Sequence, residues 1–208
     1  MVKKADVPKT ALATALNLAA QRGWRDLTLA DIAAEGGMTL AQVHEAYGSK
    51  AAILEAFSDQ IDDAVLAGDR ADLAAESVRD RLFDVLMRRF DALAPHKDAV
   101  RAIVRDGGAD PCAMMGSACR LMRSMGWMLE AARIDTSGLA GRMRIKGLMA
   151  LYADVMRTWL ADDSEDMGKT MALLDKRLGQ VDRLCAALCR FGSRRGDDLK
   201  DDAVEQPA

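Results

Sequence analysis

The chain has 208 residues, of which 50% are hydrophobic, and a formal net charge of −3 at pH 7. This charge excludes a protein that binds nucleic acid through bulk basicity, so any contact with DNA depends on where individual cations lie. Aromatic residues are few, Ala, Leu and Met are abundant, and runs of strand-forming residues are absent. The composition therefore predicts an all-α protein.

The first forty residues carry start and stop signals for two helices. Pro8 suits the first turn of a helix whose apolar stripe ends at Gly23. Thr28, followed three residues later by Asp31, is an acidic variant of the capping box and predicts the start of a second, short helix. We expect this second helix to end at the turn Gly36–Gly37.

A third helix is predicted directly after that glycine turn. Thr39 and Gln42 repeat the capping-box spacing, and Gly48–Ser49 ends the third helix and caps a fourth that extends to Val65. Two short helices around a tight turn are typical of small domains that place one helix in the DNA major groove. Residues 1–57 are therefore predicted to form a three-helix helix-turn-helix DNA-binding domain.

Beyond about residue 68 the pattern changes to long amphipathic helices separated by glycine and proline. They are expected near residues 76–93, 96–106, 112–133, 139–161 and 164–191. Residues 58–192 should then form a larger helical ligand-binding and dimerisation domain. The polar tail, residues 193–208, lacks anchoring hydrophobic side chains and is expected to be disordered.

Small, apolar and polar residues recur through residues 8–57 with a characteristic combined spacing. They are Ala15, Gly23, Thr28, Ile32–Ala33, Gly37, Thr39, Val43, Tyr47, Ser49–Lys50 and Leu54. This pattern resembles the TetR family of helix-turn-helix transcriptional regulators. The resemblance implies a dimeric, ligand-responsive regulator, most simply a repressor, that binds a near-palindromic operator in double-stranded DNA.

The same resemblance implies which residues contact DNA. The candidates lie on or beside the helix-turn-helix: Thr28, Thr39, Leu40, Ala41, Gln42, His44, Tyr47 and Lys50. Gln42 is the preferred reader of a base because its amide both donates and accepts, whereas Thr28 and Lys50 would contact phosphates. His44 and Ala46 depart from the aromatic residues common in the family. The alternative is that the helix-turn-helix serves only as part of the fold and that Lys50 is solvated.

Two apolar stripes near the C-terminus predict a packing face. The residues assigned to a homodimer interface are Val155, Trp159, Met171, Leu174, Leu178 and Val181. Stripes in adjacent helices can meet their symmetry mates in a four-helix interface or pack within one chain. The family resemblance favours the dimer.

A methionine-rich helix is the candidate wall of a pocket for a small, apolar ligand. The assigned residues are Met115, Met122, Met125, Trp127, Tyr152 and Met156. Methionine adapts to irregular ligands, although such stripes also serve as plain core. Arg120, Arg123 and Arg133 can equally meet an anionic ligand or remain solvated.

A second, looser resemblance covers residues 126–175. It is to a lipid-binding accessory protein of ubiquinone biosynthesis, which has a TetR-like fold, binds an isoprenoid lipid and does not act through DNA. This resemblance implies the alternative function of a lipid or quinone carrier. The acidic, hydrophilic tail of the present chain argues against docking on a membrane.

The sequence contains no motif that indicates another class of function. No phosphate-cradling glycine loop, metal-ligand spacing or nucleophile motif is present, so neither an enzyme nor a cofactor is expected. The four cysteines lack CxxC spacing and suit either core filling or thiol sensing. Without an apolar leader or a run of about 18 apolar residues, we expect a cytoplasmic protein with no membrane span.

Overall fold

The computed structural model describes residues 3–68, 76–107 and 111–183, the side chains of 111–113 excepted. Within these ranges every regular element is a helix, which confirms the predicted all-α class. The expected end of the last helix at residue 191 and the tail 193–208 lie outside the described residues. So do the side chains of Cys112, Cys185 and Cys189.

The N-terminal part consists of a short 3-10 helix, η1 (Lys4–Asp6), and three α-helices. These are α1 (Val7–Arg22), α2 (Leu29–Glu35) and α3 (Leu40–Ala46). The three α-helices contact one another in every pair. Val43 of α3 is fully buried in their common core, so the predicted trihelical unit is present.

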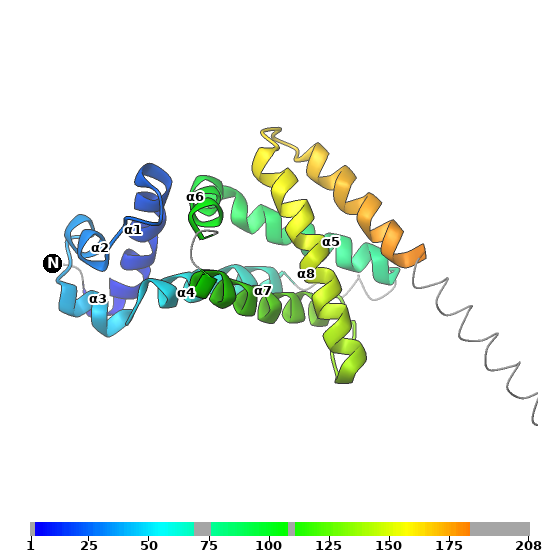
Figure 1. Ribbon diagram of the computed structural model, residues 1–208, viewed down its shortest axis with the longest axis horizontal. Coiled ribbons are helices and arrows are strands. Elements are labelled where there is room, and N and C mark those ends of the chain that lie inside the picture. The colour runs from blue at the N-terminus through cyan, green and yellow to red at the C-terminus, as the bar shows by residue number, and fades with distance from the viewer. Residues whose placement is uncertain (1–2, 69–75, 108–110, 184–208) are drawn as a thin grey trace, which may run out of the picture.

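The remaining helices form the body of the molecule (Figure 1). In chain order they are α4 (Lys50–Ala67), α5 (Val78–Leu93), η3 (Ala94–His96), α6 (Lys97–Gly107), α7 (Pro111–Ala131), α8 (Gly138–Ala161) and a last helix over residues 168–183. Each of these α-helices overlaps a range predicted from the sequence, whereas η3 was not predicted. α4 continues without a break through residue 57, so this one helix belongs to both the N-terminal part and the body.

Local side-chain hydrogen bonds explain where the short helices begin. The Thr28 hydroxyl accepts from the Asp31 amide at 3.1 Å, and the Thr39 hydroxyl accepts from the Gln42 amide at 3.2 Å. Both sites are complete capping boxes, as predicted, because each third residue also accepts from the amide of the cap. Gly37, in the turn between α2 and α3, has φ +62°, a conformation in which glycine avoids the strain of a Cβ atom.

Aromatic side chains join α5 to α8 in the core of the body. Phe90 stacks on Tyr152 with ring centroids 5.2 Å apart, and the ring centroid of Trp159 lies 5.7 Å from that of Phe90. All three are buried. α8 is therefore fixed against α5 by large apolar surfaces, each of which contributes strongly to stability when buried.

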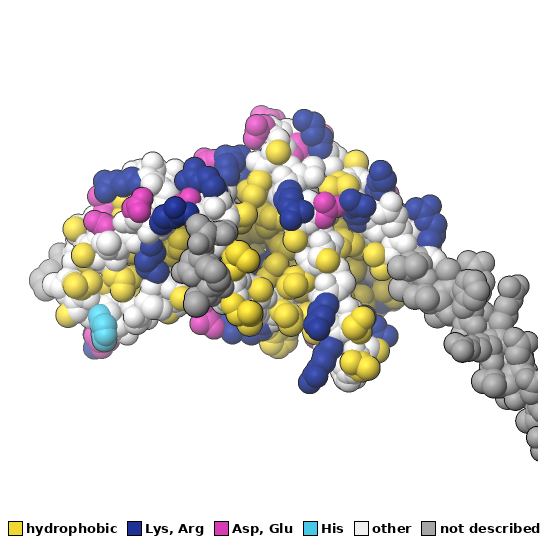
Figure 2. Space-filling model, in the orientation of Figure 1, with side chains coloured by type: hydrophobic (Ala, Val, Ile, Leu, Met, Phe, Trp, Pro, Cys, Tyr) yellow, Lys and Arg dark blue, Asp and Glu magenta, His cyan; other side chains and the backbone are white. Residues whose placement is uncertain are grey.

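On the face shown in Figure 2, hydrophobic side chains gather in the middle of the body, between α6 and α8. None of the described helices is both long enough and apolar enough to cross a membrane. The described residues also include no group of three or more His, Cys, Asp or Glu side chains placed to hold a metal ion.

Candidate functional site

α3 presents a largely neutral surface at its N-terminal end. Thr39, Leu40, Ala41 and His44 are exposed, and Leu40 has an exposed fraction of 53%. Exposed apolar side chains at the start of such a helix suit contact with thymine methyl groups. The predicted reading residues therefore lie together on one accessible surface.

Gln42 lies on the same helix but is half-buried. Its Oε1 atom accepts from the amide of Thr39 at 2.8 Å, in the capping box. The side-chain amide group of Gln42 is left as a donor. Gln42 is thus equipped to donate to an acceptor on a base edge, such as guanine O6 or N7 or thymine O4.

Lys50, the predicted phosphate contact, also has a structural role. Its Nζ atom donates to the main-chain carbonyl oxygens of Trp24 (2.6 Å) and Arg25 (3.0 Å), and it lies 5.0 Å from the centre of the Trp24 ring. Partial burial lowers the pKa of Lys50. An ammonium group has three donors, so one remains after these two hydrogen bonds.

Two other predicted DNA residues are held by intramolecular hydrogen bonds. The Tyr47 hydroxyl donates to the carbonyl oxygen of Pro8 at 3.1 Å and so ties the end of α3 to the start of α1. The Thr28 hydroxyl donates to the Asp31 carboxylate at 2.5 Å within the α2 cap. Near the outer end of α3, Glu45 forms an exposed ion pair with Lys4 at 2.6 Å, so its charge is partly offset.

α6 reaches the N-terminal part through Asp106, which sequence analysis did not single out. Asp106 Oδ2 accepts from the amides of Trp24 (2.7 Å) and Arg25 (3.1 Å) in the segment between α1 and α2. Hydrogen bonds from the Arg105 side chain and then from these two amides lower the pKa of Asp106 to about 2. The carboxylate is therefore a charged link between the body and the helix-turn-helix.

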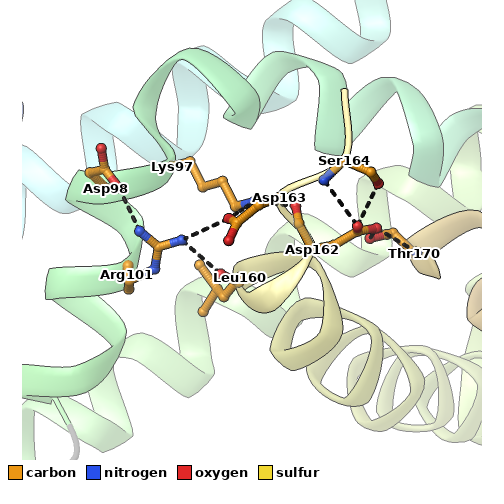
Figure 3. Close-up of polar contacts among 8 residues, drawn as sticks. All are labelled: Lys97, Asp98, Arg101, Leu160, Asp162, Asp163, Ser164 and Thr170. Atoms are coloured by element: carbon orange, nitrogen blue, oxygen red, sulfur yellow. Dashed lines mark hydrogen bonds and ion pairs between the residues drawn. The ribbon is translucent and has the colours of Figure 1, made fainter. Parts of the chain in front are cut away.

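The opposite end of α6 is anchored to the end of α8 (Figure 3). Lys97 Nζ donates to the carbonyl oxygen of Asp162 at 2.5 Å, and Arg101 Nη2 donates to that of Leu160 at 2.8 Å. Cations are favourable here because helix C-termini carry partial negative charge. The Asp162 carboxylate accepts from both the amide and the hydroxyl of Thr170, at 2.9 and 2.8 Å, and joins α8 to the last helix.

A cavity of about 170 Å³ lies where α4, α5, α6, α7 and α8 meet. Most of its lining side chains are apolar, and two α6 residues, Val100 and Ile103, contribute to it. Tyr152 and Met156, two of the six residues predicted for a pocket, also line this cavity. α6 therefore borders the cavity between its two anchored ends.

The other four predicted pocket residues lie elsewhere. Met125 is fully buried in the core, Met122 is half-buried, and Met115 has an exposed fraction of 69%. Trp127 borders a separate hollow of about 220 Å³ beside Arg88. The methionines of α7 thus divide between core and surface because only one side of that helix faces the other helices.

A buried polar network forms one side of the 170 Å³ cavity. Arg89 of α5 lines the cavity, pairs with Asp62 of α4, and donates to the Tyr152 hydroxyl at 3.2 Å. Ser124 of α7 donates to Asp62 at 2.6 Å. The Arg89–Asp62 ion pair was not predicted from the sequence, since the two residues are 27 positions apart and resemble ordinary solvated charges on amphipathic helices.

Residues assigned to the dimer interface divide into two groups in the single chain. Val155, Trp159, Leu174 and Leu178 are buried, with exposed fractions of 5% or less. Met171 and Val181 of the last helix are exposed, at 39% and 47%. Four of the six side chains therefore pack within the chain, and two remain accessible on its surface.

Comparison with known proteins identifies the N-terminal segment. Residues 11–57 match the family model described as bacterial regulatory proteins of the tetR family. This match contains α2, α3 and the start of α4, including all eight residues predicted to contact DNA. No curated protein sequence matches the chain significantly.

Solved structures extend the similarity to the body. A TetR transcriptional regulator from Nitrosomonas europaea has a TM-score of 0.70 and 23% identity, over 83% of this chain and 96% of that one. A TetR regulator from Rhodococcus has a TM-score of 0.63 and 18% identity, over 86% and 97%. The ubiquinone-biosynthesis alternative receives no support from these comparisons. Residues 11–57 of this chain match the TetR family, and the chain has the fold of TetR-family transcriptional regulators.

Proposed function

We propose that the protein is a ligand-responsive transcriptional regulator that binds a near-palindromic operator as a homodimer and acts as a repressor. The observation that carries this proposal is the accessible N-terminal end of α3 within a TetR-family segment. A dimer would place two such helices in successive major grooves, one helical turn of DNA apart. Leu40, Ala41 and His44 would face the base edges, with Gln42 donating from beside them.

α6 is the element through which the cavity would act on the helix-turn-helix. It borders the cavity at Val100 and Ile103 and holds the α1–α2 segment through Asp106. A ligand that favours a shifted position of α6 would displace this segment and change the separation of the two α3 helices. Such a ligand must bind the two conformations with different affinity to release DNA.

The dimer in this proposal uses the accessible side of the last helix. Met171 and Val181 are exposed apolar residues on that helix and are available to a second copy. The buried residues Leu174 and Leu178 fix the helix against its own chain and hold this surface in place.

The test is selection from a pool of genomic fragments with purified protein, followed by a salt titration on any enriched site. We expect one near-palindromic sequence whose affinity falls steeply with salt, since phosphate contacts release counterions. Leu40→Ser should lower affinity for that site by about tenfold, the cost of a lost base contact. Val78→Ser is the matched control, because Val78 has the same 53% exposed fraction but lies on α5. Absence of enrichment at low salt would make the helix-turn-helix a scaffold only.

A further inference from the structure

Arg120 of α7 is a half-buried cation on the wall of the 170 Å³ cavity. Its guanidinium group folds back along α7 and donates to the Ser117 hydroxyl at 2.8 Å. Among the described residues, Arg120 forms no ion pair with a carboxylate. This partly desolvated guanidinium group therefore has no direct ion-pair partner, although Glu55 attracts its charge through space.

The acidic side chains nearest to Arg120 on α4 are already engaged. Arg123, one turn further along α7, donates to Glu55 at 2.8 Å and to Asp59 at 3.0 Å. Both carboxylates are therefore paired on the outer side of the α4–α7 contact. Arg120 instead lies on the cavity side of α7. Partial burial lowers the pKa of Arg120, although its guanidinium group stays charged.

Among the described residues, one of the two guanidinium groups that line the cavity, that of Arg89, has a carboxylate bound to it. Arg89 and Arg120 contribute two guanidinium groups to the cavity lining, whereas the one carboxylate bound to them is Asp62, which pairs with Arg89. Arg120 is attracted by Glu55 through space, but Glu55 is hydrogen-bonded to Arg123, so no carboxylate among the described residues is bound directly to Arg120. A cationic ligand is disfavoured by this arrangement, and a neutral ligand would leave Arg120 unpaired when it displaced water.

The remaining wall is suited to an apolar body of limited size. Leu54, Phe57, Ile61, Leu93 and Leu121 are among the lining residues, and the Ser58 and Ser117 hydroxyls are its small polar groups. A cavity of about 150 Å³ is large enough to hold a benzene molecule. The volume here, about 170 Å³, therefore fits one aromatic ring or a short acyl chain.

We infer that the cavity binds a monocarboxylate whose apolar body is about one aromatic ring or a short acyl chain, with its carboxylate on Arg120 and the Ser117 hydroxyl. This inference rests on the proposed function, in which the cavity takes the regulating ligand. It assigns the chemical class of that ligand. Arg89 remains paired with Asp62 and lines the apolar end beside Tyr152.

Isothermal titration calorimetry on the full chain without DNA tests the assignment. The probes are two pairs of matched size: benzoate with benzamide, and hexanoate with hexanamide. The acids should bind about ten- to a hundredfold more tightly than the amides, the usual range for a hydrogen bond to a charged group. Arg120→Gln should abolish this preference, and Arg120→Lys should retain part of it.

Arg133→Gln is the matched control, since it removes the same charge from an exposed residue just beyond α7. This variant should keep the acid preference of the wild-type protein. Equal binding of acids and amides, or no binding of either, would overturn the assignment, as would an unchanged preference in a folded Arg120→Gln protein. If that variant does not fold, as judged by circular dichroism, the acid and amide comparison on wild-type protein decides the question.

The experiment separates this inference from the proposed function because DNA is absent from it. Enrichment of an operator together with no acid preference would contradict the ligand class alone. Acid binding in a protein that enriches no DNA fragment would contradict the regulator and leave the monocarboxylate site standing.

Discussion

Lys50 and Asp106 hold opposite sides of the same two-residue backbone segment. Lys50 donates to the carbonyl oxygens of Trp24 and Arg25, and Asp106 accepts from the amides of the same two residues. We call each of these two sets of hydrogen bonds a clamp: the Lys50 clamp comes from α4 and the Asp106 clamp from α6. The α1–α2 segment is thus held by side chains from two helices of the body.

The Asp106 clamp should make stability depend on pH in acid. The pKa of Asp106 is depressed from 3.8 to about 2 in the folded protein, so its contribution is present above pH 3.8 and is lost as pH falls toward 2. Asp106→Asn should therefore flatten the fall in unfolding free energy over this range. Urea titrations at a series of pH values measure it. Asp63→Asn, an exposed substitution in α4, controls for net charge, and identical curves for wild type and Asp106→Asn would refute the clamp.

Lys50→Ala should weaken binding to every DNA sequence and reduce the salt dependence by about one unit of slope, as for the loss of one phosphate contact. Because Lys50 also holds the α1–α2 segment, a drop in melting temperature should accompany this loss. Fluorescence anisotropy across a salt series measures the first effect. Lys146→Ala removes an exposed lysine from α8 and is the control. Unchanged affinity in a folded Lys50→Ala protein would leave Lys50 with the structural role alone.

Leu178→Asp should unfold or strongly destabilise the chain, because Leu178 is only 5% exposed and a buried carboxylate lacks a partner. The cost should exceed about 3 kcal/mol. Met171→Glu combined with Val181→Glu changes exposed residues and should keep the melting temperature of the isolated chain while weakening the dimer. Sedimentation velocity with thermal unfolding distinguishes these results. A stable dimer in the double variant would move the interface to another surface.

Asp62→Ala should cost about 3–5 kcal/mol, since it leaves Arg89 charged, buried and unpaired. Replacing the pair together, Asp62→Leu with Arg89→Met, should recover most of this loss because neither buried charge remains. Guanidinium unfolding measures both variants. Equal destabilisation by the single and double substitutions would indicate that packing around α4, rather than the ion pair, determines the cost.

Short-range signals made the helix boundaries predictable. The capping boxes at Thr28 and Thr39 need partners only three residues away, so the sequence contains all their components. The α7 helix was also predictable, but which of its methionines face a cavity depends on helices far away in the chain. The periodicity at Leu174 and Leu178 indicated a buried face, although periodicity alone does not say whether the chain or a second copy covers it.

The polar contacts of the body could not be predicted in this way. The Asp106 contact spans 82 positions and the Asp62–Arg89 pair spans 27. Both carboxylates occur in helices where acidic residues are common on the solvated face. Only the arrangement of α4, α5 and α6 in space distinguishes them from ordinary surface charges.

The contact between Asp106 and the Trp24 amide has a consequence for synthesis on the ribosome. The N-terminal helices are made first, yet one of their fixing residues follows 82 positions later, about 4–16 s at usual bacterial elongation rates of about 5–20 residues per second. A nascent chain thus carries its three N-terminal helices before α6 can hold the α1–α2 segment. Truncation before α6 would leave this same incompletely held state, so the N-terminal helices alone are a poor substitute for the full chain in DNA-binding experiments.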